Sequence, residues 1–367
     1  MNNKTNKKTI FFTGGGSGGH VVPALTLIEK IDRDLYDVHY IGSKEGIESK
    51  LTKNKVSKYH SIKVGKLRRY FSFQNMLDIM NVFIGLIQAF FTIATHKSKD
   101  SIVISMGGFV SVPVVIAAKL NGLDIFIHEQ TTRVGLANKI GSKFAKKVMV
   151  SFKDSLKFFP SDKVIYTGYP VRDSFYNHEI QIEEIDKFNF MKKDKPLLFI
   201  TGGGNGAELI NTQIKKDLSL LKRDFYIVHQ VGQNYIEEYL SYADEDYKPV
   251  AFIGDEMPSL LKAASVIISR SGAGTVSELL SIGKRSIFIP LKIAQKNEQY
   301  HNAMEAQKLL KSVVISEDEL RRASIANVIK KFQEEDSSQS LNNIEKDIKK
   351  ASEVIIKECS LVLNKSV

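Results

Sequence analysis

Short runs of apolar residues recur along the chain, each followed by glycine or polar residues and then by a segment with helical spacing. In the first half these runs occupy 10–13, 38–41, 59–64, 102–105, 125–127, 148–150 and 164–167. In the second half they occupy 197–201, 225–228, 250–253, 266–269, 286–289 and 313–315. Short buried strands that alternate with helices are typical of parallel sheets covered on both faces. The pattern predicts an α/β protein with two Rossmann-like parallel-sheet domains.

Residues 74–96 carry apolar side chains at every third or fourth position, which predicts a long helix with a wide apolar face. Asp78, Asn81 and Gln88 interrupt its most apolar window, so it falls short of the ~20 apolar residues of a clean membrane span. We expect the stripe from Phe83 to Phe91 to belong to a core rather than to a membrane anchor.

Two similar glycine-rich stretches follow the first strand of each half. Residues 14–20 read GGGSGGH and residues 202–206 read GGGNG, and each follows an apolar run that ends in threonine. Glycine permits positive φ and close approach of a ligand, and the N-terminus of a following helix favours phosphate. Pro23 fits the first turn of that helix. Five glycines within 14–19 exceed the need of a tight turn, which favours a diphosphate-binding loop over a turn without a ligand.

The repeat of this strand, loop and helix suggests two domains that face each other across a cleft. We expect the first domain to cover residues 1–168, with a last helix, about 344–367, packing back onto it. The second would cover 169–343, with a polar, acidic linker over about 177–195 before its first strand. Further helices are expected over 136–146 and near 154–158.

Composition limits the class of protein. The chain has 367 residues, 43% of them hydrophobic and 25% charged, as in ordinary globular domains. Cys359 is the single cysteine, which excludes a disulfide framework and fits a reducing compartment. No His, Asp or Cys spacing predicts a metal site, and the polar, basic residues 1–8 do not resemble a signal peptide.

The net charge of +11 indicates an anionic partner, such as nucleic acid, acidic lipid or a phosphorylated substrate. Residues 50–69 contain eight Lys and Arg and no Asp or Glu, and Tyr70, Phe71 and Phe73 follow. This segment fits a contact with anionic headgroups, where each cation contributes about 1 kcal/mol. The alternative is a solvated basic face in front of a core helix.

Ligands of parallel sheets bind beyond the carboxyl ends of the strands, where polar residues and glycines collect in this chain. The most informative segment is 269–278, in which Gly272 and Gly274 make a tight turn after a buried strand. Thr275 is the expected N-cap, which places Glu278 in the first helical turn. Glu278 then either accepts hydrogen bonds from ribose hydroxyls or caps the helix dipole.

Histidines offer candidate bases. His20 lies in the first glycine loop at a helix N-terminus, where a neutral imidazole suits a general base. The alternative is an imidazole that bonds to the loop backbone. His128 and Glu129, at a strand end, are either a second base pair or a support for their loop.

At these positions the chain closely resembles the MurG family of peptidoglycan N-acetylglucosaminyltransferases. The matching segments occur in family order over almost the whole chain: GGGSGGH at 14–20, PAL at 23–25, GGFVS at 107–111, HEQ at 128–130, GLANK at 135–139, PVR at 170–172, GGG at 202–204, RSGAGTVSE at 270–278 and QYHNA at 299–303. Each is modest alone, and together they are highly specific.

The resemblance implies a two-domain GT-B glycosyltransferase fold and transfer of N-acetylglucosamine from UDP-N-acetylglucosamine to lipid I, with inversion, to give lipid II. It implies peptidoglycan synthesis by a peripheral enzyme on the cytoplasmic face of the plasma (inner) membrane, on an anionic surface, with no cofactor, no built-in metal and no nucleic acid. The N-terminal domain would hold the acceptor and the C-terminal domain the donor. His20 would be the base on the acceptor hydroxyl.

The resemblance also implies donor contacts. Uracil would meet the backbone of Ile253, and Glu278 would hold the ribose. The remaining donor-binding residues would cradle the diphosphate or contact the sugar: Ser17, Gly18, Gly19, Thr131, Arg172, Gly204, Ala273, Gly274, Thr275, Val276, Ser277 and Gln299.

Three positions depart from the family pattern. Thr131 stands where the family usually has Asn, Tyr169 replaces Asn before Pro, and Gly204 replaces Ser in the second loop. They leave open a related transferase that uses another UDP-hexose or a glycerolipid acceptor.

Two other classes are considered. Gly14, Gly16 and Gly19 fit a dinucleotide fingerprint, but the next strand ends without an acidic residue for an adenine ribose, which argues against an NAD-dependent oxidoreductase. A basic nucleic-acid-binding protein is unsupported by any recognised motif.

Overall fold

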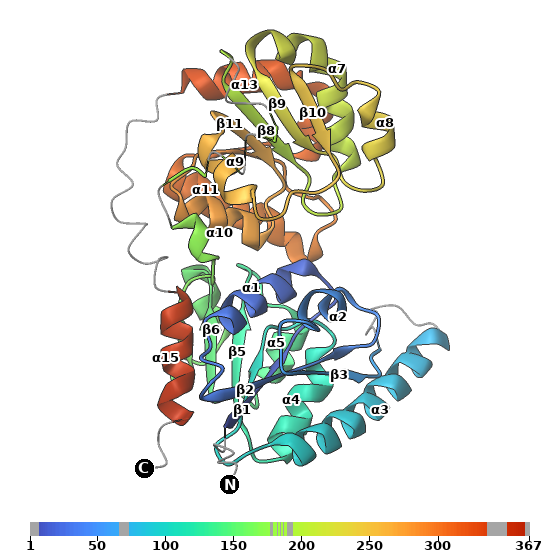
Figure 1. Cartoon of the computed structure of the whole chain (residues 1–367), viewed down its shortest axis with the longest axis vertical. Coiled ribbons are helices and arrows are strands. Elements are labelled where there is room, and N and C mark those ends of the chain that lie inside the picture. Colours follow the sequence, from blue (N-terminus) through green and yellow to red (C-terminus); the bar gives the residue numbers. More distant parts are fainter. Residues whose placement is uncertain are drawn as a thin grey trace. The chain divides into compact units, whose positions relative to one another are not determined.

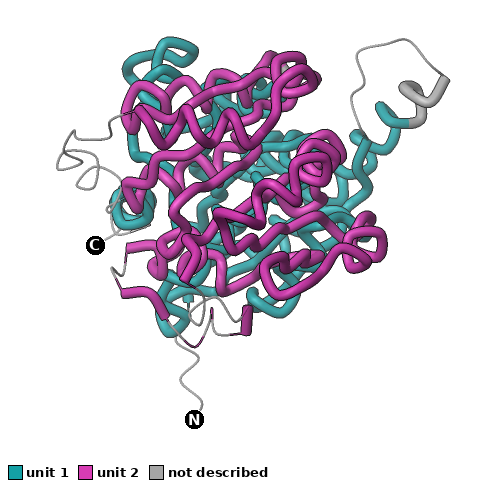
Figure 2. Tube along the Cα trace, turned by 90° about the horizontal axis from the view of Figure 1, so that it is seen from above, with its two compact units in different colours: residues 1–171, 350–367 teal, residues 172–349 magenta. Residues whose placement is uncertain are grey.

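The computed structural model describes residues 7–65, 73–176, 179–181, 183, 185, 187, 188, 194–335 and 351–363. The chain divides into two compact units, coloured in Figure 2: Met1–Val171 with Lys350–Val367 form unit 1, and Arg172–Lys349 form unit 2. The basic, aromatic stretch 66–72, most of the expected linker and residues 344–350 lie outside the described residues.

Unit 1 is built on a parallel sheet of seven strands in the order β3-β2-β1-β4-β5-β6-β7 (Figure 1). These strands confirm the seven apolar runs of the first half. Their bounds are β1 Lys8–Thr13, β2 Tyr36–Ser43, β3 Lys58–Ile62, β4 Ile102–Ser105, β5 Asp124–Glu129, β6 Lys147–Val150 and β7 Val164–Tyr166.

Two clusters of buried apolar side chains, one containing Phe11 and Ile93 and the other Phe12 and Ile355, hold the helices of unit 1 to its sheet. Ile355 comes from α15, which packs against α1 near the start of the chain. The helices are α1 Gly18–Glu29, α2 Ile47–Thr52, α3 Phe73–His96, α4 Ser111–Leu120, α5 Leu136–Gly141, α15 Ala351–Leu363 and the 3-10 helix η1 Lys153–Phe158.

Unit 2 repeats the design with a parallel sheet of six strands in the order β10-β9-β8-β11-β12-β13. Its strands are β8 Leu197–Thr201, β9 Tyr226–Gln230, β10 Tyr247–Val250, β11 Val266–Ser269, β12 Ile287–Phe288 and β13 Val313–Val314. Its helices are η2 Asp173–Phe175, α7 Glu208–Asp224, α8 Ile236–Leu240, α9 Met257–Ala263, α10 Ala273–Ser281, η4 Gln295–Asn297, α11 Glu298–Leu310, α12 Glu317–Arg322 and α13 Ile325–Glu334.

Helix starts differ from the sequence prediction where glycines were assigned to loops. Helix α1 begins at Gly18, so Pro23 lies inside the helix and not in its first turn. Helix α10 begins at Ala273 with Gly272 as its N-cap, so the prediction of Thr275 as N-cap is wrong. In both places glycines predicted to be in a loop lie inside the first turn of the helix: Gly18 and Gly19 in α1, and Gly274 in α10.

Two other elements are shorter or shifted. Helix α5 ends at Gly141 because the chain turns back and Lys146 donates its backbone N–H to Ile125 at 2.8 Å. Strand β10 ends at Val250, so Ile253 lies in the following loop. This strand contains Pro249, which an edge strand tolerates because one side of its backbone needs no ladder partner.

The outer face of α3 is apolar and exposed, which corrects the expectation of a core stripe. Phe83 and Phe91 are 62% and 61% exposed, while only the opposite face, with Ala89 and Ile93, is buried. Within the described chain, the stretch Asp78–His96 is long and apolar enough to cross a bilayer, with a mean hydropathy of 1.5.

Candidate active site

In each unit the glycine loop lies where the strand order reverses. The loop after β1 faces the loop after β4, and Gly15 donates its backbone N–H to Gly107 at 3.3 Å. The loop after β8 similarly neighbours the segment after β11, where Arg270 donates its N–H to Thr201 at 3.3 Å. Ligands of doubly wound sheets bind at this topological switch point. Each unit therefore offers its own candidate ligand-binding region at its switch point.

The buried side chain of Glu48 is hydrogen-bonded to the first glycine loop. Glu48, in α2, accepts the backbone N–H of Gly16 at 3.2 Å and that of Ser43 at 3.1 Å. The Gly16 amide is therefore already bonded within the protein, which leaves the amides at the start of α1, after Ser17, as the donors best placed for an anion. Gly18 and Gly19 are the first two residues of that helix, and Ser17 is its N-cap.

His20 is the third residue of α1, and its ring approaches the loop after β4. Its Nδ1 lies 3.1 Å from Oε1 of Gln130, a buried residue just after β5. Gly108 has a φ of +80°, and a Cβ there would lie only 3.1 Å from Cδ2 of His20. Gly108 thus leaves the space that the imidazole occupies.

Glu129 supports its own loop. Its carboxylate accepts the N–H and the hydroxyl of Thr131 at 3.1 and 3.0 Å, the N–H of Gly135 at 3.1 Å and Nδ2 of Asn138 at 3.0 Å. Of the two hypotheses for this residue, these contacts favour loop support over base catalysis. The hydroxyl of Thr131 also contacts the carbonyl of Arg133, so it is engaged within the loop.

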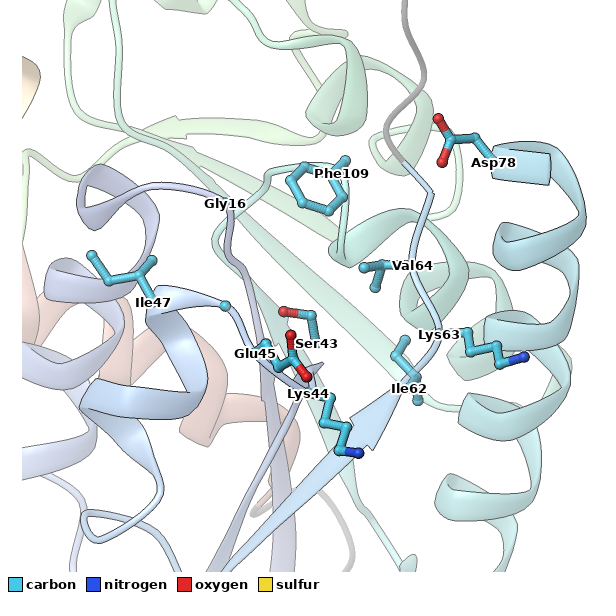
Figure 3. A pocket seen from close by; sticks show the side chains of 11 residues that line it. Gly16, Ser43, Lys44, Glu45, Ile47, Ile62, Lys63, Val64, Asp78 and Phe109 are labelled. Atoms are coloured by element: carbon cyan, nitrogen blue, oxygen red, sulfur yellow. The ribbon is translucent and has the colours of Figure 1, made fainter. Parts of the chain in front are cut away.

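A cavity of about 590 Å³ opens beside the first glycine loop (Figure 3). Gly16 and the ring of Phe109 form one wall, and a Cβ at Gly16, whose φ is +83°, would lie 2.5 Å from that ring. The opposite walls come from residues 43–47, residues 62–64 and Asp78 of α3. The cavity therefore joins the glycine loop to the start of the helix with the exposed apolar face.

In unit 2, helix α10 points its N-terminus out of the switch point. Ala273, Gly274 and Thr275 are its first residues, whose amides lack acceptors inside the helix, while Val276 donates to Gly272 at 3.0 Å. Val276 and Ser277 are buried behind them. Glu278 lies in the second turn, too far along the helix to cap it, so the capping hypothesis is wrong.

Burial raises the pKa of Glu278 to about 7, and the positive charge of Arg172 acts against that rise. Nη1 of Arg172 lies 3.5 Å from Oδ1 of Asp255, and the guanidinium stacks over Phe175. Its buried Nε has no hydrogen-bond partner among the described residues. A carboxylate and a guanidinium thus stand near the helix N-terminus, a combination suited to a nucleotide.

Two glutamines order the loops of unit 2. Nε2 of Gln230 donates to the carbonyl of Gly203 at 2.9 Å, and Oε1 of Gln230 accepts the backbone N–H of Ile253 at 2.8 Å. The N–H of Ile253 is therefore bonded within the protein, and this bond does not involve the Ile253 carbonyl. Gln299 accepts the N–H of Leu291 at 3.0 Å, which directs its amide nitrogen away from that contact. Gly204, at the exposed tip of the second loop, lies beside Phe252.

The sequence prediction gave no role to Glu48, Gln130 or Gln230, although Gln130 belongs to the HEQ motif at 128–130. Each is buried and bridges a glycine loop or candidate base to a neighbouring strand end. Gln230 is the last residue of a strand and Gln130 directly follows one, as the other candidate site residues do, so their positions in the sequence could have indicated a role. No such sequence signal marks Glu48, because only the fold brings α2 next to the first glycine loop.

Comparison with known proteins agrees with this architecture. The model of the glycosyltransferase family 28 N-terminal domain matches residues 10–150, and that of its C-terminal domain matches residues 197–358. A protein of Clostridium tetani named UDP-N-acetylglucosamine–N-acetylmuramyl-(pentapeptide) pyrophosphoryl-undecaprenol N-acetylglucosamine transferase is 40% identical, over 86% of this chain and 87% of its own length. The chain belongs to the MurG family of glycosyltransferases.

Another MurG relative, from Clostridium novyi, is 39% identical over 92% of this chain and 96% of its own length. The crystal structure of MurG from Acinetobacter baumannii superposes with a TM-score of 0.73 at 24% identity, covering 96% of this chain and 99% of that one. The predicted two-domain parallel-sheet glycosyltransferase fold is therefore confirmed.

Proposed function

We propose that this protein transfers N-acetylglucosamine from UDP-N-acetylglucosamine to the muramoyl 4-hydroxyl of lipid I, the undecaprenyl-diphosphate-linked muramyl pentapeptide, and so makes lipid II for peptidoglycan. The observation that carries the proposal is the 40% identity over both units with a transferase named for this reaction. Two features of the structure support it. In each unit a glycine loop lies where the strand order of the sheet reverses, and in unit 2 the N-terminus of α10 lies near the Glu278 carboxyl group.

His20 acts as the general base in this proposal. It takes the proton of the acceptor hydroxyl, whose oxygen attacks the anomeric carbon from the face opposite UDP, and the glycosidic bond to UDP breaks with inversion. The amides of Ala273, Gly274 and Thr275 and the guanidinium of Arg172 stabilise the negative charge on the leaving diphosphate. Glu278 accepts hydrogen bonds from the ribose.

Other donor contacts follow the family resemblance. The carbonyl of Ile253 faces uracil, and the amide nitrogen of Gln299 contacts the sugar or phosphate. The remaining donor contacts are Ser17, Gly18, Gly19, Thr131, Gly204, Val276 and Ser277. Thr131 and Gly204 offer chiefly backbone groups, since the Thr131 hydroxyl is engaged in its loop.

Unit 1 takes the acceptor and unit 2 the donor. The cavity beside Phe109 is a place for the acceptor headgroup. Ile79, Phe83 and Phe91 on the exposed face of α3 fit the interfacial region of an anionic membrane, to which the net charge of +11 also draws the protein. We therefore propose that the enzyme acts as a peripheral protein on the cytoplasmic face of the inner membrane.

The deciding experiment measures transfer of radiolabelled sugar from UDP-N-acetylglucosamine, UDP-glucose and UDP-galactose to two acceptors, a soluble lipid I analogue and a diacylglycerol. Label from N-acetylglucosamine alone is the expected result. Label from another hexose, or transfer to a glycerolipid but not to lipid I, would instead support the related transferase that Thr131, Tyr169 and Gly204 leave open.

A further inference from the structure

Four residues of unit 1 form a directed chain of hydrogen bonds that ends on His20. His128 Nε2 lies 3.1 Å from the carbonyl oxygen of Gly168, and His128 Nδ1 lies 3.3 Å from Nε2 of Gln130. Oε1 of Gln130 lies 3.1 Å from Nδ1 of His20. His128 and Gln130 are 0% and 1% exposed, so water does not compete for the bond between them.

Two backbone carbonyls fix the direction of this chain. The carbonyl of Gly168 can only accept, so His128 must carry its proton on Nε2 and present a lone pair at Nδ1. The Gln130 amide nitrogen also donates to the carbonyl of His128 at 3.0 Å, which prevents the amide from turning over. The oxygen of Gln130 therefore faces His20, and only a protonated Nδ1 of His20 can bond to it.

From this geometry we propose that Gln130 and His128 are positioning residues that hold His20 as the Nδ1–H tautomer, with the lone pair on Nε2 for the acceptor hydroxyl. The inference rests on the proposed role of His20 as base. Which nitrogen of a histidine is free is set by the hydrogen bond that the other nitrogen makes. A base locked in the wrong tautomer loses most of its catalytic contribution.

The chain needs His128 to stay neutral, because an imidazolium would carry a second proton on Nδ1 and repel the Gln130 amide. Burial lowers the pKa of His128 to about 4, so the ring is neutral at physiological pH. The proposal itself stands on the four contacts and on the two carbonyls that orient them.

The test records long-range ¹H–¹⁵N spectra of the full-length protein labelled with ¹⁵N-histidine, with the His20 signals assigned by their loss in His20→Ala. We expect lone-pair character at Nε2 of His20 in the wild type. In Gln130→Met, of similar length but without the acceptor oxygen, the Nε2–H form should appear and kcat should fall ~10-fold or more, with KM for the donor unchanged. His128→Phe should produce a smaller shift in the same direction, because the carbonyl of His128 still orients Gln130.

Gln130→Glu is the conservative variant, because a carboxylate still accepts from Nδ1. We expect it to keep the wild-type tautomer and more activity than Gln130→Met, with the acidic limb of the kcat/KM profile at higher pH since the carboxylate favours the imidazolium. Ser155→Ala is the matched control: it removes a 2.8 Å bond to the carbonyl of Thr131 without touching the chain, and the His20 signals should not change. UDP binding checks that each variant is folded.

An Nε2–H tautomer in the wild type would overturn the inference, even if the variants do not fold. So would a folded Gln130→Met that keeps both the tautomer and kcat. A near-normal turnover of His20→Ala has a different meaning: it would remove His20 from the chemistry and overturn the proposed mechanism, and with it the catalytic purpose of the chain.

Discussion

The carboxylate of Glu48 accepts a hydrogen bond of 3.2 Å from the backbone N–H of Gly16, 32 residues earlier in the chain. The side chain is fully buried, and Ser43 donates to it through both its N–H and its hydroxyl. The Glu48 side chain thus accepts a hydrogen bond from the Gly16 amide, which would otherwise be available to a diphosphate. The first glycine loop is shaped by the protein itself, and anion binding is left to the start of α1.

Replacing Glu48 by Gln should loosen this loop. The amide offers one acceptor oxygen and turns its NH₂ toward a backbone N–H or hydroxyl, so a buried donor loses its partner, at a cost of about 1–3 kcal/mol. We expect a lower free energy of unfolding in urea and a lower kcat/KM for the acceptor. Glu29→Gln, on a surface ion pair with Lys55, is the control and should change neither. Unchanged stability in Glu48→Gln would show that the loop does not depend on the carboxylate.

Glu278 should make donor binding depend on pH. Its pKa is raised by burial to about 7, so the protonated form is favoured in the folded protein. Because the folded pKa lies above the unfolded value, the contribution of Glu278 to the free energy of unfolding is largest below about pH 4.5 and falls as pH rises through 7. Affinity for UDP should rise over the same interval as the carboxylate ionises and accepts from ribose.

Calorimetric titration of UDP between pH 5.5 and 8 tests this prediction. Glu278→Gln should bind more weakly at pH 8 and lose the pH dependence, and Glu278→Ala should also bind weakly with its fold intact. A wild-type affinity that does not vary with pH, or an unchanged affinity in Glu278→Ala, would remove Glu278 from the ribose site.

The cluster of His39, His60 and His96, near the end of α3, should make unit 1 less stable in acid. Nε2 of His60 lies 3.1 Å from Nδ1 of His39, and Nε2 of His39 lies 2.9 Å from Oδ2 of Asp37. Nζ of Lys58 lies 3.1 Å from Nε2 of His96. Burial, aided by the neighbouring cations, lowers the pKa of His60 to about 4, and burial also lowers the pKa of His39. Since these folded pKa values lie below the unfolded value near 6.5, stability is retained above pH 6.5 and lost as pH falls toward 4.

The measurement is the melting temperature as a function of pH between 4 and 7. His60→Gln can still donate to His39 and does not titrate, so its curve should be flatter than that of the wild type. Parallel curves would mean that other groups cause the acid loss. The described residues contain no group of three or more His, Cys, Asp or Glu placed to hold a metal ion.

The exposed face of α3 should determine membrane affinity. The double variant Phe83→Ser and Phe91→Ser removes two aromatic side chains that are mostly exposed. We therefore expect the free energy of unfolding to change little. Partitioning onto anionic phospholipid vesicles should fall at least roughly 10-fold, since burying one such side chain is worth about 1.5–3 kcal/mol. Leu35→Ser, at a site that is 60% exposed between α1 and β2, is the control for loss of an exposed apolar side chain outside α3. Equal partitioning of both variants would place the membrane contact elsewhere.

The amino-acid sequence alone predicted the two parallel sheets, their strands and the position of the glycine loops, because buried apolar runs and helical spacing are local properties of a chain. It also placed His20, Arg172 and Glu278 beyond strand ends. Which side chains contact each other depends on the three-dimensional fold. Glu48 reaches Gly16, and Gln130 reaches His20 across 110 residues, through contacts that no local pattern encodes. The exposure of Phe83 and Phe91 was likewise undecided, because an apolar helix face has the same spacing whether it packs on a core or faces outward.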